Sequence, residues 1–199
     1  MPADAAADEF WRALRARHPP LRAAVLADAR ITAAQRGERH EFRSRFDAAC
    51  QLARLALVSD AFLAQACYRV KARLQARGVP VLPRLAHRAA MALAQVSIGD
   101  PVLVAPGVYL LHGQVVIDGI VEIAEGVTIA PWVTIGLRAG NVRGATIERN
   151  VSIGTGAKVI GPVRIGEGAV IGANAVVVDD VPSGATVVGA PARRVDRPR

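Results

Sequence analysis

Aliphatic residues recur at every sixth position along the second half of the chain, often with a small residue, usually glycine, directly after them. The main series is Ile147, Ile153, Val159, Ile165, Ile171 and Val177. The same period runs through Ile98, Val104, Leu110 and Val116, slips by one residue, and resumes at Ile123, Ile129 and Ile135. A period of six is neither helical nor that of an ordinary strand. It predicts a parallel β-helix of hexapeptide repeats, in which each hexad forms one side of a coil.

Three hexads complete one triangular coil, so residues eighteen apart stack when nothing is inserted. The pattern predicts about four coils, with one extra residue between Val116 and Ile123. A larger break over 137–146 contains glycine, asparagine and arginine, and predicts a loop at a coil corner. Loops on a rigid scaffold often carry binding residues, although a neutral surface insertion is the alternative.

The first half shows helical spacing instead. Helices are expected over 8–17, 21–35 and 40–58, then from a cap at Ser59 to about 78, and finally up to about Ala94. The predicted fold class is therefore α+β. A helical domain at 1–95 caps the coils and mediates assembly, a β-helix occupies 96–195, and a basic tail occupies 196–199.

Charge and cysteine content limit the partners and the compartment that are expected for the protein. The formal net charge is +8, but base-contacting motifs and interleaved aromatic residues are missing, so no nucleic-acid partner is expected. The charge fits either a solvated arginine-rich surface or a field that attracts an anionic small molecule. Cys50 and Cys67 lack metal-type spacing and favour a reducing compartment. The sequence shows neither a signal peptide nor a membrane-spanning run, so a cytoplasmic protein without a membrane partner is expected.

The stacking rule places His112, Pro131, Thr155 and Ala173 in one column. With coils about 4.8 Å apart, His112 and Ala173 are about 14 Å apart, which matches an extended pantetheine arm. The backbone amides of Gly154 and Gly172 are expected to bond that arm. Because His112 is the only histidine after residue 95, a multi-histidine zinc site is not expected. Its imidazole suits a general base near neutral pH, and an ordinary surface histidine is the alternative.

Several segments resemble the serine O-acetyltransferases, over roughly residues 60 to 195. These segments are Tyr68-Arg69-Val70, Gly78-Val79-Pro80, Leu111-His112-Gly113, Gly126-Val127-Thr128-Ile129, Val133-Thr134-Ile135-Gly136, Gly154-Thr155-Gly156-Ala157 and Val188-Gly189-Ala190-Pro191. The resemblance implies a left-handed coil, a trimer with active sites between subunits, and direct transfer from acetyl-CoA to a serine hydroxyl. It places His112 on the catalytic histidine. No metal is expected. The candidate cofactor-binding residues are Gly136, Gly154, Thr155, Gly172, Ala173, Arg193 and Arg194.

The acceptor side departs from the family pattern. The catalytic carboxylate falls on Ser97, the aspartate before the histidine on Leu111, and a second histidine on Gly144, while the substrate-binding arginine is kept as Arg143. Pro131-Trp132 replaces a glutamine and a small residue. Another acid, Asp100 or Asp118, is then needed to orient His112.

The leading hypothesis is an acetyl-CoA-dependent O-acetyltransferase with His112 as general base and Arg143 and Ser97 at the acceptor. Serine is the best single acceptor, but the departures predict weak activity on L-serine and a carboxylate or phosphate on the preferred acceptor. The alternatives are an acetyltransferase for an amino sugar or natural-product intermediate, and a non-catalytic assembly protein. The expected assembly is a homotrimer or a dimer of trimers. No tail-mediated cysteine synthase complex is expected, because the sequence ends without the isoleucine that such complexes use.

Overall fold

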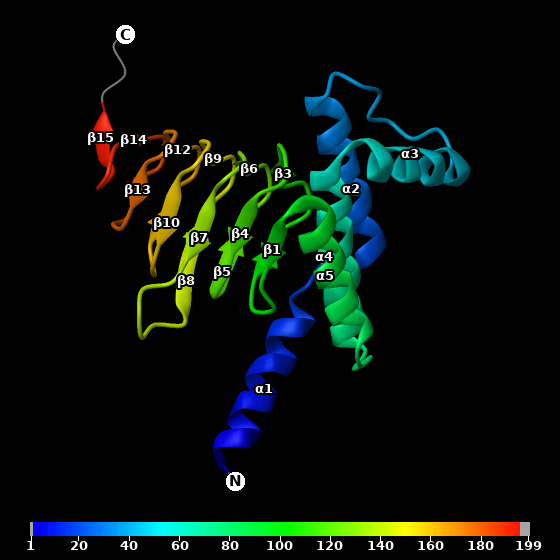
Figure 1. The fold of residues 1–199 in the computed structure, drawn as a ribbon, viewed down its shortest axis with the longest axis horizontal. Helices are drawn as coiled ribbons and strands as arrows, with labels where there is room; N and C mark the ends of the chain where they lie inside the picture. The colour runs from blue at the N-terminus through cyan, green and yellow to red at the C-terminus, as the bar shows by residue number, and fades with distance from the viewer. Residues whose placement is uncertain (1, 196–199) are drawn as a thin grey trace.

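The computed structural model describes residues 2–195, which form five helices followed by a parallel β-helix (Figure 1). The expected basic tail at 196–199 lies outside this range. The helices are α1 (Pro2–Ala16), α2 (Leu21–Gln35), α3 (Arg45–Val58), α4 (Asp60–Ala76) and α5 (Leu82–Ala94). The predicted cap is confirmed, since the Ser59 side chain accepts a hydrogen bond from the Phe62 amide. The helix expected from residue 40 begins only at Arg45, where Ser44 caps it.

The strands form three sheets, one for each side of the coil. The first sheet contains β1 (Val96–Ile98), β4 (Val115–Ile117), β7 (Thr134–Gly136), β10 (Lys158–Ile160) and β13 (Val176–Val177). The second contains β2 (Leu103–Val104), β5 (Ile120–Ile123), β8 (Arg143–Ile147) and β11 (Arg164–Ile165). The third contains β3 (Tyr109–Leu110), β6 (Thr128–Ile129), β9 (Ser152–Ile153), β12 (Val170–Ile171), β14 (Thr186–Val188) and the antiparallel β15 (Arg193–Val195). This arrangement confirms the predicted fold class.

The coils number about five rather than four, because β13, β14 and a bridge between Ile165 and Val181 complete a further turn. The prediction that Val116 occupies an inward repeat position was also wrong. Ile117, not Val116, stacks on Ile98 and is buried, while Val116 is 42% exposed. The extra residue therefore lies between Leu110 and Ile117, immediately beside His112, and not between Val116 and Ile123.

The predicted break is shorter than expected. Arg143 and Gly144 belong to β8, so the loop comprises only 137–142. Strand β8 contains one more residue than β5 between their paired positions, since Ile120 pairs with Arg143 but Glu122 pairs with Thr146. This shift in register accommodates part of the insertion. The insertion thus extends a strand as well as a corner, as the projection of β8 shows (Figure 1).

Side chains of α4 close the open end of the β-helix. Gln65 donates to the carbonyl of Val108, the Tyr68 hydroxyl donates to that of Val102, and Lys71 donates to that of Ile98. Arg69 donates to the carbonyls of Val104 and Ala105. These are carbonyls of the first coil, which has no coil before it. Since an unpaired buried carbonyl is costly, α4 supplies the partners that a preceding coil otherwise provides.

Asp28 of α2 completes this cap. Its carboxylate accepts hydrogen bonds from Arg69 and from the backbone amide of Gly107, and both charged side chains are almost fully buried. Helix α2 is thereby fixed to the first coil through α4.

Within residues 2–195, no helix is long and apolar enough to cross a membrane, and no three His, Cys, Asp or Glu side chains are grouped to hold a metal ion.

Candidate functional site

His112 lies at the corner that joins the third sheet to the first sheet, directly after β3, and its side chain is exposed. Each coil turns this corner through one residue with a left-handed backbone. By strand register these residues stack, and they are Gln95, Gln114, Trp132, Gly156 and Asn174, with φ between 55° and 73°. The first coil has one residue more here than the coils above it, so His112-Gly113 stands where the second coil has only Pro131. The insertion pushes the His112 segment outward.

The end of α5 fixes the His112 corner in place. The amide of Gln114 donates to the carbonyl of Ala94 at 3.1 Å. A Cβ at Gly113 would lie only 1.9 Å from that same carbonyl oxygen. A glycine is therefore required beside His112, because the helix backbone occupies the space of a side chain.

His112 borders a hollow of about 310 Å³ between this corner, the start of α4 and the end of α5. Asp60 and Arg36 contribute charge to the hollow, and Leu111 and Gln95 also line it. The sequence analysis missed Asp60 and Arg36 because they lie in the helical half. The only available signal was the position of Asp60 directly after the Ser59 cap.

Neither acid proposed to orient His112 is bonded to it. Asp100 pairs with Lys71 at 3.0 Å, and one Asp118 oxygen accepts the amide of Gly119. Partial burial raises the pKa of Asp100, but the hydrogen bond and charge of Lys71 outweigh it and lower the pKa below its usual range. Among the described residues, His112 has no hydrogen bond or salt bridge, so its imidazole is free to meet a ligand.

The strand register brings His112, Pro131, Thr155 and Ala173 into the predicted column, since Leu110, Ile129, Ile153 and Ile171 pair in sequence. The side chains of His112, Thr155 and Ala173 are exposed.

The amides expected to bind the pantetheine arm are not free. Gly154 donates to the carbonyl of Ile171, and Gly172 to that of Val187, each at 2.8 Å. Both amides belong to the ladder between coils, which the sequence analysis did not count. Gly154 has a packing role instead, because a Cβ there would lie 2.7 Å from the backbone nitrogen of Ala173.

Arg193 and Arg194 lie at the opposite end of the column from His112. Strand β15 pairs antiparallel with β14, so Arg193 faces Val188 of the last coil. Arg193 is exposed and lies 3.7 Å from Asp179. The column thus has an imidazole at one end and guanidinium groups at the other.

Arg143 and Gly136 lie at a different corner, which joins the first sheet to the second. One chain therefore does not bring Arg143 to His112. Ser97 lies between the two corners, half-buried on the first sheet and opposite Val116. Gly144 is buried, and a Cβ there would lie 2.4 Å from Val121, so this position cannot present a side chain to an acceptor.

Trp132 is the most unusual residue near His112. It has a left-handed backbone, with φ of 66°, and is 58% exposed. Large side chains rarely adopt this conformation. Lys158 holds the corner by donating to the carbonyls of Trp132 and Gly156. The indole stands one coil above the His112 corner.

Comparison with known proteins agrees with this geometry. The family description "Bacterial transferase hexapeptide (six repeats)" matches residues 144–179. The chain is 38% identical to the serine acetyltransferase of Synechococcus elongatus over 68% of its own length and 57% of that enzyme's length. It is 36% identical to the serine acetyltransferase of Helicobacter pylori J99 over 67% of its own length and 80% of that enzyme's length.

The similar solved structures are also serine acetyltransferases. Soybean serine acetyltransferase complexed with serine superimposes with a TM-score of 0.73 at 32% identity, covering 90% of this chain and 71% of that one. The Neisseria gonorrhoeae enzyme in complex with serine gives 0.73 at 28% identity, covering 87% and 68%. Sequence identity, coverage and fold agree, and the chain therefore belongs to the serine acetyltransferase family.

Proposed function

We propose that the protein transfers the acetyl group of acetyl-CoA directly to the hydroxyl of a small acceptor, with L-serine as the best single candidate. His112 takes the hydroxyl proton as the oxygen attacks the thioester carbonyl. The CoA thiolate then leaves and is protonated. Because binding holds acceptor and thioester together, no acyl-enzyme is required. Relatives named serine acetyltransferase, and solved serine acetyltransferases in complex with CoA or serine, support this reaction.

The observation that carries the proposal is the exposed column between His112 and β15. From β3 to β15 it crosses five strand-to-strand steps, or about 24 Å at the usual strand spacing. An extended arm laid along it has its thioester at His112 and its phosphates near Arg193 and Arg194. The exposed Thr155 and Ala173 side chains are small enough to leave the path open. Gly136 is proposed to contact the donor from a neighbouring copy.

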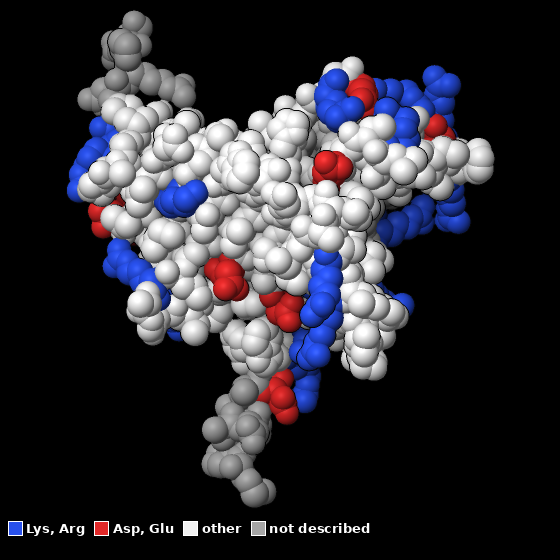
Figure 2. Space-filling model, viewed as in Figure 1, with Lys and Arg blue, Asp and Glu red and all other residues white. Residues whose placement is uncertain are grey.

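The acceptor site is proposed to form between two copies of the chain. Arg143 and His112 lie at different corners of one triangle, so Arg143 reaches an acceptor at His112 only from a neighbour. There its planar guanidinium binds the acceptor carboxylate. The face formed by the first sheet carries few charged side chains (Figure 2), and Val116 and Trp132 are exposed along it. This face suits the contact in a homotrimer.

An acceptor other than serine is favoured by one feature, the exposed indole of Trp132 beside a corner that carries Leu111 in place of an acid. An apolar wall of this kind suits a larger acceptor, such as an amino sugar or a natural-product intermediate. Ser97 also lacks the charge that binds an ammonium group. These residues predict a kcat/KM for L-serine below the ordinary enzyme range of about 10⁴ M⁻¹s⁻¹.

The test is release of CoA thiol from acetyl-CoA with a panel of acceptors: L-serine, L-homoserine, phosphoserine, amino sugars and no acceptor. Acceptor-dependent thiol release that Arg143→Ala weakens through the acceptor KM alone supports the proposal. Failure of every acceptor, with no binding of CoA, would leave a non-catalytic assembly protein.

A further inference from the structure

A second and larger pocket lies in the helical domain, away from the His112 hollow. Its volume is about 1050 Å³, and α1, α2, α3 and α4 surround it. The walls are mostly apolar, with Val25, Leu26, Leu52, Ala66 and Val70 among the lining residues. None of the residues that line the His112 hollow takes part.

Five arginines line this pocket without a described anionic partner. They come from four segments: Arg15 of α1, Arg22 of α2, Arg45 of α3, and Arg73 and Arg77 at the end of α4. None of the five forms a salt bridge with any described side chain, and no carboxylate lines the pocket.

Elsewhere on the helices, several arginines form salt bridges with nearby carboxylates. Arg36 and Arg54 both pair with Glu38, and Arg39 pairs with Asp47. Arginines with carboxylates nearby are therefore paired on the same helical surface. The five pocket arginines are exposed and lie around apolar walls without such partners, so an anion placed among them would not have to displace a carboxylate.

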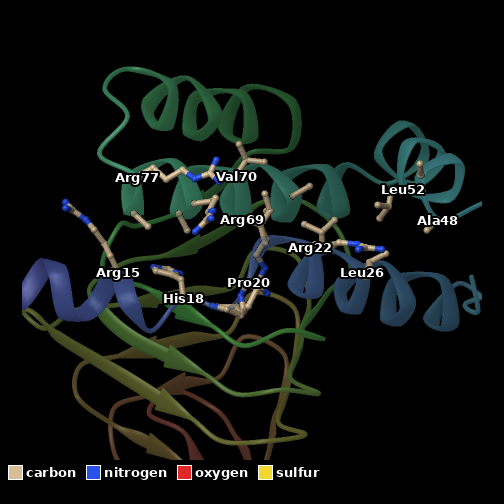
Figure 3. Close-up of a pocket in the computed structure, with 18 of the residues that line it drawn as sticks. Arg15, His18, Pro20, Arg22, Leu26, Ala48, Leu52, Arg69, Val70 and Arg77 are labelled. Carbon is tan, nitrogen blue, oxygen red and sulfur yellow. The ribbon is translucent and has the colours of Figure 1, made fainter. Parts of the chain in front are cut away.

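The two ends of the pocket have different lining residues (Figure 3). Arg15 and Arg77 lie at one end, whereas Leu26, Ala48 and Leu52 lie at the other, with Arg22 beside Leu26. His18 lies between the ends on the α1 side. Burial, together with the charges of Arg69 and Lys71, lowers the pKa of His18 to about 4, so this imidazole is neutral at pH 7. The free positive charge therefore comes from the arginines.

We propose that this pocket binds an acyl-chain carboxylate, with the carboxylate between Arg15 and Arg77 and the chain directed toward Leu26, Ala48 and Leu52. A planar guanidinium pair suits a carboxylate, because each group donates two parallel hydrogen bonds. The apolar walls suit an alkyl chain, and the volume lies just above the usual range for small-molecule sites.

The experiment is isothermal titration of dodecanoate, below its micelle concentration, into the intact protein. Two probes separate head from tail: acetate has the carboxylate without the chain, and dodecyltrimethylammonium has the chain with the opposite charge. We expect saturable binding of dodecanoate alone. Saturable binding of the cationic probe with similar affinity would show that the pocket is merely apolar, and would overturn the proposal.

Variants locate the binding. Arg15→Gln with Arg77→Gln is expected to raise the dodecanoate Kd by about tenfold or more. The matched control is Arg84→Gln with Arg88→Gln on α5, two exposed arginines outside the pocket, and is expected to change the Kd less than about twofold. Ala48→Glu places a carboxylate beside Leu26 and Leu52, where the alkyl chain is proposed to lie, and should also weaken binding. Equal Kd values in all three variants, each with an unchanged circular dichroism spectrum, would refute the site. Absence of dodecanoate binding to the assembled wild-type protein would refute it as well.

Discussion

At the residue scale, the proposed function depends on the environment of His112. The side chain is exposed, lacks a described partner, and is presented by a corner with one extra residue. Gly113 and Gln114 attach that corner to the end of α5. A histidine held by its backbone but left free at its ring can accept a proton from an acceptor hydroxyl.

Replacing His112 with alanine is expected to lower kcat by about 10²- to 10⁴-fold, because a general base contributes that much. The KM for acetyl-CoA should change little, since most of the donor lies along the rest of the column. The measurement is thiol release at saturating donor. His40→Ala, an exposed histidine in the helical half, is the control and should keep full activity. Unchanged turnover in the His112 variant would remove its catalytic role.

His18 makes a separate prediction about pH. Its pKa is lowered to about 4 in the folded protein, chiefly by burial. Between pH 4 and its ordinary value near 6.5 the unfolded chain therefore binds more protons, and stability falls as pH falls through this window. His18→Gln should have a shallower decline of Tm from pH 6.5 to 4 than the wild type, whereas His40→Gln should follow the wild type. Parallel curves for all three would contradict the prediction.

At the scale of elements, α4 and α5 cover the first coil of the β-helix, which has no preceding coil to pair with. Helix α4 satisfies the open carbonyls, and α5 supplies the surface against which the His112 corner is fixed. The helical domain therefore helps to hold the proposed active-site corner in place.

Tyr68→Phe tests the cap. The hydroxyl donates to the Val102 carbonyl at 2.7 Å and accepts from the Val104 amide at 3.3 Å, and the side chain is buried. Removing it leaves both groups without a partner and should lower the free energy of unfolding by about 1–3 kcal/mol. Tyr109→Phe, whose hydroxyl has no described hydrogen bond, is the matched control and should cost little. Chemical denaturation measures both, and equal losses would argue against a specific cap.

Gly113→Ala tests the corner. The new methyl group would lie 1.9 Å from the Ala94 oxygen, so α5 or the corner must move, at a cost of about 1–3 kcal/mol. Gly136→Ala is the control, because a Cβ there meets nothing closer than 3.7 Å. Only the first variant should lower Tm, and kcat is compared between the Gly113 variant and the wild type, because Gly136 is itself proposed to contact the donor. A Gly113 variant with wild-type values would show that the corner is not held by α5.

At the scale of the whole molecule, Arg143 and His112 lie at different corners of one chain, so the proposed acceptor site needs a second chain. Two exposed surfaces bear on assembly: the weakly charged face of the first sheet, and the helices that project from the coil axis (Figures 1 and 2). In the proposed trimer, the first surface would bring neighbouring corners together in a closed ring.

Mixed assemblies test this arrangement. His112→Ala and Arg143→Glu chains are each expected to have little activity at low acceptor concentration. Co-assembled in equal amounts in trimers, they should recover about a quarter of wild-type activity, because one site in four joins an intact His112 to an intact Arg143. Sedimentation equilibrium verifies the trimer. No recovery from verified mixed trimers would place both residues in one subunit's site.

The sequence was sufficient to predict the repeat and the column. A six-residue period of aliphatic residues has only one compact solution, with stacked inward positions, so His112, Thr155 and Ala173 could be aligned from their spacing alone. The same period could not locate a single inserted residue, because Val116 and Ile117 are both aliphatic and only packing distinguishes which one points inward. It also could not show that the amides of Gly154 and Gly172 donate to carbonyls of the next coil.

The sequence by itself therefore determined the coil and its class of chemistry, since these depend on local periodicity, and it singled out His112 as the candidate base because no other histidine follows residue 95. Tertiary structure decided the surroundings of that base. Asp60 and Arg36 reach the His112 hollow, Asp100 is taken by Lys71, Gly144 is buried, and Arg143 faces another corner. These relations join residues far apart in the chain, and only the packing of helices on coils brings them together or separates them.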